Sequence, residues 1–249
     1  MRDLLKNADI VVPLAAIVGA PSSTRDQIAT VSVNRDAVVM LVKLLSPTQQ
    51  IVYPMTNSSY GTGEAGKTCT EDTPFLPISL YASTKVEAEI AILSHPNAIS
   101  VRLATVFGMS PRMRIDLLVN DFVYRAVKDR AVVIFEGHFR RSYVHIRDVA
   151  SVFLHCMEHF DAMRGRPYNL GLDKANLSKI ELCQLIQQKI PEFVFLEAPI
   201  GEDPDQRNYV VSSARLHSTG FFPSYSLAQG IDELLKGYTT LSNSDYGNV

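Results

Sequence analysis

The chain has 249 residues, of which 46% are hydrophobic and 20% charged, and its formal net charge is −2. This composition is typical of a globular protein with one large domain or two small ones, and the near-neutral charge excludes a broad basic surface for nucleic acid or an anionic membrane. Cys69, Cys156 and Cys183 show no CxxC spacing, so we expect neither a disulfide framework nor a structural zinc site, and we expect a reducing, cytoplasmic location.

The apolar run Ile10–Ala20 has two interpretations. It resembles a secretory signal because it follows Lys6 and ends in small residues. Against this, Asp3 and Asp9 occupy the region where a signal carries positive charge, and the run is too short to span a bilayer. We therefore predict a buried strand at 10–14, followed by a turn of small residues.

Beyond this strand, short apolar runs alternate with longer segments of helical periodicity. Apolar residues recur at helical spacing over Ile28–Leu45, which predicts a helix. Strands are then predicted at Ile51–Met55, Ile99–Leu103 and Ala131–Phe135, and helices at Ser79–Ser94, Arg114–Lys128, Val149–His159 and Lys179–Lys189. Such alternation predicts an α/β protein built on a parallel sheet.

From about Arg166 the regular alternation of short apolar runs with helical segments ends. Strands are predicted at 167–171 and Phe193–Ala198, a polar loop at 199–208, and a closing helix at Ser226–Tyr238 with Ser226 as its N-cap. We expect a sheet domain over residues 1–150 and a small α/β substrate-binding cap mainly over 151–249, with the two interleaved.

Tyr81 and Lys85 are spaced to lie on one face of the predicted helix. A phenol normally titrates near pH 10, and a neighbouring ammonium would lower that pKa enough for the phenolate to act as a base. Taken alone, the spacing favours an exposed helix pair without a catalytic role. Thr56 strengthens the catalytic interpretation because it ends a predicted strand, and open α/β sheets bind ligands at strand ends.

Several motifs in fixed order resemble the extended short-chain dehydrogenases and reductases, in particular the NAD-dependent nucleotide-sugar epimerase/dehydratase family. Leu14-Ala15-Ala16, the run from Thr56 to Tyr60-Gly61, and Tyr81-x-x-x-Lys85 are the first matches. The later matches are Arg102–Gly108, Arg141–Ala150, Tyr168–Gly171, Arg207 and the closing region Leu216–Leu235. The resemblance covers nearly the whole chain.

The resemblance implies a Rossmann-like doubly wound parallel sheet, NAD as cofactor with NADP left open, a nucleotide-diphosphate sugar as substrate, and a homodimer. It implies catalytic roles for Thr56, Tyr81 and Lys85. Cofactor contacts are implied at Leu14, Ala15, Ala16, Asn34, Tyr81, Lys85 and Val106, and substrate contacts at Asn57, Asn120, Arg141 and Arg207. Surface salt bridges remain the alternative for the two arginines, and non-functional polar positions the alternative for Asn34 and Asn120. The histidines show no metal-ligand pattern, so no metal site is expected.

The chain departs from this family at three places. It has no Gly-x-x-Gly-x-x-Gly turn to hold a pyrophosphate, so the sheet is expected to lack its first strands and to leave strand 10–14 at an exposed edge. Asn57 and Ser58 replace the Asp-Glu pair with which 4,6-dehydratases move protons, and Ser142 replaces an aspartate after Arg141. We therefore expect a nucleotide-sugar epimerase acting through hydride transfer at C4. A 4-dehydrogenase or reductase of the same fold, or a truncated non-catalytic homologue, are the alternatives.

Overall fold

The computed structural model describes residues 2–63, 67–201 and 208–240. Its central feature is a four-stranded parallel sheet in the order β1-β2-β4-β8. The strands are β1 (Ile10–Val11), β2 (Gln50–Thr56), β4 (Ala98–Leu103) and β8 (Arg166–Leu170). β1 pairs with β2, β2 with β4, and β4 with β8, all in parallel, which confirms the predicted parallel α/β class.

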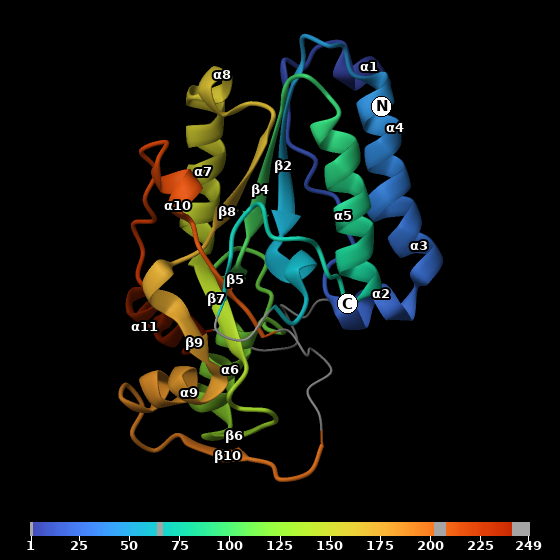
Figure 1. Cartoon of the computed structure of the whole chain (residues 1–249). Helices are drawn as coiled ribbons and strands as arrows, with labels where there is room; N and C mark the ends of the chain where they lie inside the picture. The colour runs from blue at the N-terminus through green and yellow to red at the C-terminus, as the bar shows by residue number, and fades with distance from the viewer. Residues whose placement is uncertain (1, 64–66, 202–207, 241–249) are drawn as a thin grey trace.

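Helices cover both faces of this sheet because its strands are apolar on both sides (Figure 1). On one face, Ile51, Tyr53 and Met55 of β2 are buried against the segment 27–44 and α5 (Leu80–Leu93). On the other face, Val52 is buried in a cluster with residues of α7 (Ile146–Glu158) and α8 (Phe160–Met163). Successive residues of a strand point to opposite faces, so β2 takes part in both cores.

The first predicted strand is only partly right. The strand is two residues long, and Ile10 and Leu14 are exposed, so the prediction of a buried strand over 10–14 is wrong. Among the described residues β1 pairs only with β2, which places it at the edge of the sheet. A strand with one neighbour has no second strand to bury its side chains, which explains its exposure.

The predicted helix at 28–45 contains an interruption. α3 (Gln27–Val31) and α4 (Ala37–Leu44) are joined without a break by the π-helical turn η1 (Ser32–Asp36). A π turn inserts an extra residue and shifts the side chains that follow it. Asn34, in the middle of this turn, is thereby buried.

A second group of elements packs below the main sheet in the view of Figure 1 and has its own apolar core. Its helices are α6 (Leu118–Lys128), α9 (Lys179–Gln187) and α11 (Leu227–Tyr238). Its strands are β6 (Ala131–Ile134) with β10 (Val194–Glu197), and β5 (Thr105–Phe107) with β7 (Arg140–His145) and β9 (Asn176–Ser178). The shorter elements are α1 (Arg2–Leu5), α2 (Ala20–Arg25), η2 (Asn57–Tyr60), β3 (Thr68–Cys69), η3 (Asp173–Ala175), β11 (Val210–Val211) and α10 (Ala214–His217).

Segments from both sides of residue 150 contribute to each layer. β8 completes the main sheet, and α6 and β6 pack with α9, α11 and β10 in the lower group. Two predicted helices also begin elsewhere: α6 starts at Leu118 rather than Arg114, and α7 at Ile146 rather than Val149, because His145 caps it by accepting from the Arg147 N–H. The domain boundary near 150 stays a prediction, and residues 202–207 of the predicted loop lie outside the described chain.

Candidate active site

A cavity of about 680 Å³ lies at the carboxyl ends of the central strands. In the paired register Thr56 at the end of β2 stands beside Leu103 at the end of β4, and both line the cavity. The start of α5 forms one wall and the segment Leu103–Gly108 another. This is the position at which open α/β sheets bind ligands, so the cavity is the candidate active site.

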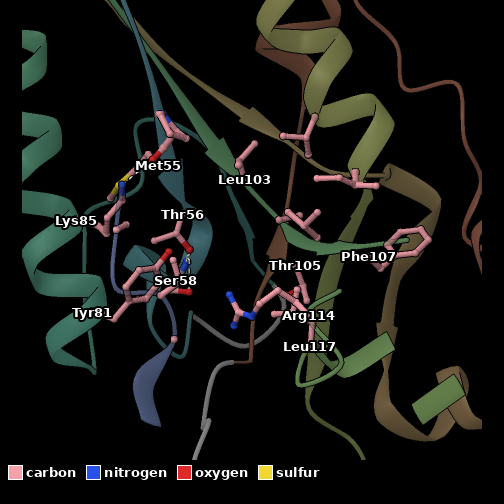
Figure 2. Close-up of a pocket in the computed structure, with 18 of the residues that line it drawn as sticks. Met55, Thr56, Ser58, Tyr81, Lys85, Leu103, Thr105, Phe107, Arg114 and Leu117 are labelled. Carbon is pink, nitrogen blue, oxygen red and sulfur yellow. Dashed lines mark hydrogen bonds between the residues drawn. The ribbon is translucent and has the colours of Figure 1, made fainter. Parts of the chain in front are cut away.

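The three predicted catalytic residues meet in this cavity, as Figure 2 shows. The Thr56 hydroxyl donates to the Ser58 hydroxyl oxygen (2.9 Å) and accepts from the Ser58 N–H (3.1 Å). The tight turn η2 that brings them together ends at Gly61, where φ is +65° and a Cβ would lie 2.0 Å from the Leu76 carbonyl oxygen. Only glycine fits at that position, which explains the Tyr60-Gly61 motif.

Tyr81 and Lys85 come from the first turns of α5, whose N-terminus is capped by the Ser79 hydroxyl accepting from the Ala82 N–H. The Tyr81 ring lies beside Thr56 and Ser58 (Figure 2). Lys85 is 5% exposed and its Nζ donates to the Pro54 carbonyl oxygen at 2.7 Å. Burial lowers the pKa of Lys85 to about 7, against the opposing effect of the Glu89 carboxylate. Lys85 is therefore buried and Tyr81 half-buried, and both line the cavity, so they are not an exposed helix pair.

The predicted cofactor side is formed by the segment after β1. Leu14 and Ala16 line the cavity, as does Val106 from β5, while Ala15 does not contribute to the lining. Asn34 reaches back from the π turn: its amide oxygen accepts from the Ile17 N–H and its amide nitrogen donates to the Ile17 carbonyl oxygen, both at 2.8 Å. Asn34 thus fixes the loop that lines the cavity and is not solvent-facing.

The predicted substrate residues are not brought together in the same way. Asn120 lines the cavity, but its amide oxygen accepts from the Gly108 N–H (3.1 Å) and its amide nitrogen donates to the Arg114 carbonyl oxygen (3.0 Å). Arg141 is 2% exposed within β7 and is not part of the lining. Arg207 lies outside the described residues.

Asn57 is turned away from the cavity into a buried polar network. It is 0% exposed, and its amide nitrogen donates to the Arg102 carbonyl oxygen (3.1 Å) and to Asn169 Oδ1 (3.3 Å). Within the same network Arg102 pairs with Glu89 at 2.8 Å and donates to the Tyr60 hydroxyl at 2.9 Å. Asn57 therefore supports the strand ends from behind, because nothing in its position allows it to contact a ligand in the cavity.

Ser58, Thr105 and Arg114 are among the polar lining residues that were not predicted as site residues. Ser58 is hydrogen-bonded to Thr56, and Thr105 and Arg114 extend into the cavity across from Ser58 and Tyr81 (Figure 2). The Thr105 hydroxyl oxygen is buried without a hydrogen-bond partner among the described residues. The available sequence signal was the position of Thr105 two residues after Leu103, the predicted end of the strand, where it begins β5.

The described lining contains three cationic side chains, Lys85, Arg112 and Arg114, and no aspartate or glutamate. Arg114 is held by Asp116, which accepts from both its Nε (2.7 Å) and its Nη2 (2.6 Å). Such a cavity favours an anionic ligand electrostatically. In the described part of the chain no group of three or more His, Cys, Asp or Glu side chains is placed to hold a metal ion.

The comparison with protein families agrees with this geometry. The model of the NAD dependent epimerase/dehydratase family matches residues 1–171. The match covers more than half of the chain, and the chain therefore belongs to this family. The resemblance seen in the sequence motifs is thereby confirmed.

Individual relatives are distant. A dTDP-glucose 4,6-dehydratase of Streptomyces griseus is 27% identical over 253 residues, covering 95% of this chain and 74% of the relative. A dTDP-D-glucose 4,6-dehydratase of Mus musculus is 25% identical, covering 76% of this chain and 56% of the relative. Across the first three curated relatives the chain spans 56–74% of their length.

Solved structures support the fold. The UDP-glucuronic acid 4-epimerase of Bacillus cereus, in complex with UDP-glucuronic acid and NAD, superposes with a TM-score of 0.81 at 23% identity, covering 97% of this chain and 78% of that one. The predicted Rossmann-like fold is thus confirmed. None of the described helices is long and apolar enough to cross a membrane.

Proposed function

We propose that the chain carries the catalytic part of an NAD-dependent nucleotide-sugar epimerase that acts at C4. The observation that carries this proposal is the composition of the cavity: Thr56, Ser58, Tyr81 and Lys85 supply hydroxyl and ammonium groups, while the described lining has no carboxyl group. Oxidation of an alcohol needs only the hydroxyl and ammonium groups. Dehydration also needs an acid for the leaving hydroxyl and a base for a carbon-bound proton, and family dehydratases use carboxyl groups where this chain has Asn57 and Ser58.

The residues of this chain fit the nicotinamide and ribose end of the cofactor. Lys85 and Tyr81 lie on one wall, Val106 on another, and the loop fixed by Asn34 on a third. The sequence shown contains no glycine-rich turn for the pyrophosphate. When bound, NAD would accept a hydride from the sugar carbon and return it. This fit is the support for NAD, with NADP as the alternative.

The remaining steps belong to side chains of this chain. Thr56 and Ser58 would hydrogen-bond the sugar hydroxyl, and Tyr81 would take its proton as the C–H bond breaks. Lys85 would keep the phenolate stable in a buried place. A ketone would form at that carbon, and Tyr81 would return the proton when hydride comes back to the opposite face. The carbon is then inverted, and no net oxidation has occurred.

A dehydrogenase or reductase of the same fold uses the same residues, so the reaction products must distinguish it from an epimerase. Purified protein would be incubated with NAD and, in turn, UDP-glucuronic acid, UDP-glucose and dTDP-glucose, and products would be followed by chromatography and mass spectrometry. An epimer of unchanged mass without net NADH supports the proposal. Loss of two hydrogens with net NADH indicates a dehydrogenase, and loss of water indicates a dehydratase; either result would overturn it.

The non-catalytic alternative is tested by the same preparation. Failure to bind NAD in calorimetry, in a chain that shows a cooperative unfolding transition, would favour it. A homodimer and a cytoplasmic location remain proposals from the family resemblance and the cysteine pattern, and sedimentation and cell fractionation test them.

A further inference from the structure

Lys85 is buried, which lowers its pKa, and its ammonium is held by contacts other than a salt bridge. Its Nζ lies over the face of the Tyr53 ring, 4.0 Å from the ring centroid, and donates to the Pro54 carbonyl oxygen at 2.7 Å. Tyr53 is 0% exposed, in the core between β2 and α5. Both contacts come from adjacent residues of β2, so the strand that presents Thr56 also carries the surface on which Lys85 rests.

Among the described residues, the charged neighbour of Lys85 is Glu89, which is shared with another cation. Glu89, one turn later on α5, is 1% exposed, and its two carboxylate oxygens accept from Arg102 Nε (3.0 and 3.2 Å), Arg102 Nη2 (2.8 Å) and Ser100 Oγ. Its negative charge is therefore shared with Arg102. The other titratable groups facing Lys85 are the phenols of Tyr81 on α5 and Tyr53 on β2.

We propose that Tyr53 is a positioning residue whose ring face favours the charged form of Lys85 and fixes its ammonium one helical turn from Tyr81. A cation against a desolvated ring face gains more than it does at an exposed site, because water competes less for it. This inference rests on the proposed function in one respect: the charge on Lys85 affects turnover only if Tyr81 gives up its proton to substrate chemistry.

The ring, rather than the hydroxyl, carries this role. The Tyr53 hydroxyl is buried without a hydrogen-bond partner among the described residues, and burial raises its pKa far above the usual value for a phenol. It therefore stays neutral and offers Lys85 no charge. This separation provides a matched pair of variants: Tyr53→Phe keeps the ring and removes the hydroxyl, while Tyr53→Leu removes the ring and keeps an apolar side chain.

The direct test is an NMR titration of the Lys85 side chain in the full-length protein without ligands. Lys85 Cε and Nζ shifts would be assigned with Lys85→Met and followed against pH. We expect a midpoint near 7 in the parent protein, nearly the same midpoint in Tyr53→Phe, and a midpoint lower by about one pH unit in Tyr53→Leu. An unchanged midpoint in Tyr53→Leu, or an equal drop in Tyr53→Phe, would overturn the proposal.

If Tyr53→Leu does not fold, Tyr53→Met replaces it, since methionine fills irregular core space more readily, and the same outcomes apply. Turnover gives a second measurement: at neutral pH, kcat of the ring-deleted variant should fall several-fold below that of Tyr53→Phe, with equal KM. Equal kcat values in the two variants would contradict the role. A parent protein with no turnover would instead contradict the proposed function, while the NMR result would still decide the role of Tyr53.

Discussion

The two sides of the cavity treat their polar side chains differently. On the sheet side, formed by the end of β2 and the start of α5, Thr56, Tyr81 and Lys85 are directed at the cavity. On the cap side, formed by residues 108–117 and the start of α6, the Asn120 amide is occupied by bonds within the chain. The sheet side thus presents hydroxyl and ammonium groups to the cavity, whereas Asn120 on the cap side holds its own loop in shape.

Replacing the proton acceptor on the sheet side should have the largest effect. Tyr81→Phe should lower kcat by about 10²- to 10⁴-fold, because a positioned general base contributes that much. Binding of NAD and substrate should change little, since the ring remains. Steady-state turnover with calorimetric binding measures both, and a variant that retains full turnover would remove Tyr81 from the mechanism.

Stability should depend most on the buried network behind the sheet side. Arg102→Met leaves Glu89 as an unpaired charge at 1% exposure, which should lower the unfolding free energy by about 3–5 kcal/mol. Arg35→Met is the matched control, because Arg35 pairs with Asp36 and Glu87 on the surface and its loss should change the unfolding free energy far less. Urea denaturation compares the two variants. Similar losses of unfolding free energy would show that the buried network contributes no more than a surface ion pair.

Replacing Asn120 on the cap side should lower the stability of the fold more than it weakens substrate binding. Asn120→Ala leaves the Gly108 N–H and the Arg114 carbonyl unpaired, so we expect a loss of about 1–3 kcal/mol in the unfolding free energy. Asn120→Asp keeps an acceptor for Gly108 but buries a carboxylate against the Arg114 carbonyl oxygen, so it should lose at least as much. If Asn120→Ala instead left stability unchanged and only raised KM, Asn120 would be a direct substrate contact and the contrast between the two sides would fail.

The pKa of Lys85 predicts a pH dependence of stability. Because the pKa is near 7 in the folded protein and near 10.4 in the unfolded chain, unfolding takes up a proton between these values. The unfolding free energy should therefore rise with pH across this window, by up to about 1.4 kcal/mol per unit, and the burial penalty is complete below pH 7. Lys85→Met removes this contribution. Equal slopes for the parent protein and the variant in urea titrations between pH 7 and 9.5 would be the opposite result.

The sequence predicted the sheet side well for identifiable reasons. β2 and β4 are short apolar runs and α5 begins at the Ser79 cap, so their bounds could be predicted, and the β2–β4 register of the structure then places Thr56 beside Leu103. The predicted substrate residues are a different case, because their side chains are oriented by contacts distant in sequence. Arg141 is buried in β7, a strand that apolar periodicity did not reveal, and Asn57 is drawn behind the sheet by Arg102 and Asn169. Local sequence patterns cannot show whether such a side chain points into the cavity or into the buried interior.

The central claim is that this site oxidises and re-reduces the same sugar carbon. The most direct measurement follows deuterium from C4 of a deuterated nucleotide sugar, incubated with the protein and NAD and analysed by NMR and mass spectrometry. The account predicts a C4-inverted product that keeps deuterium at C4. Deuterium found on the released cofactor, or at another carbon of a dehydrated product, would contradict it.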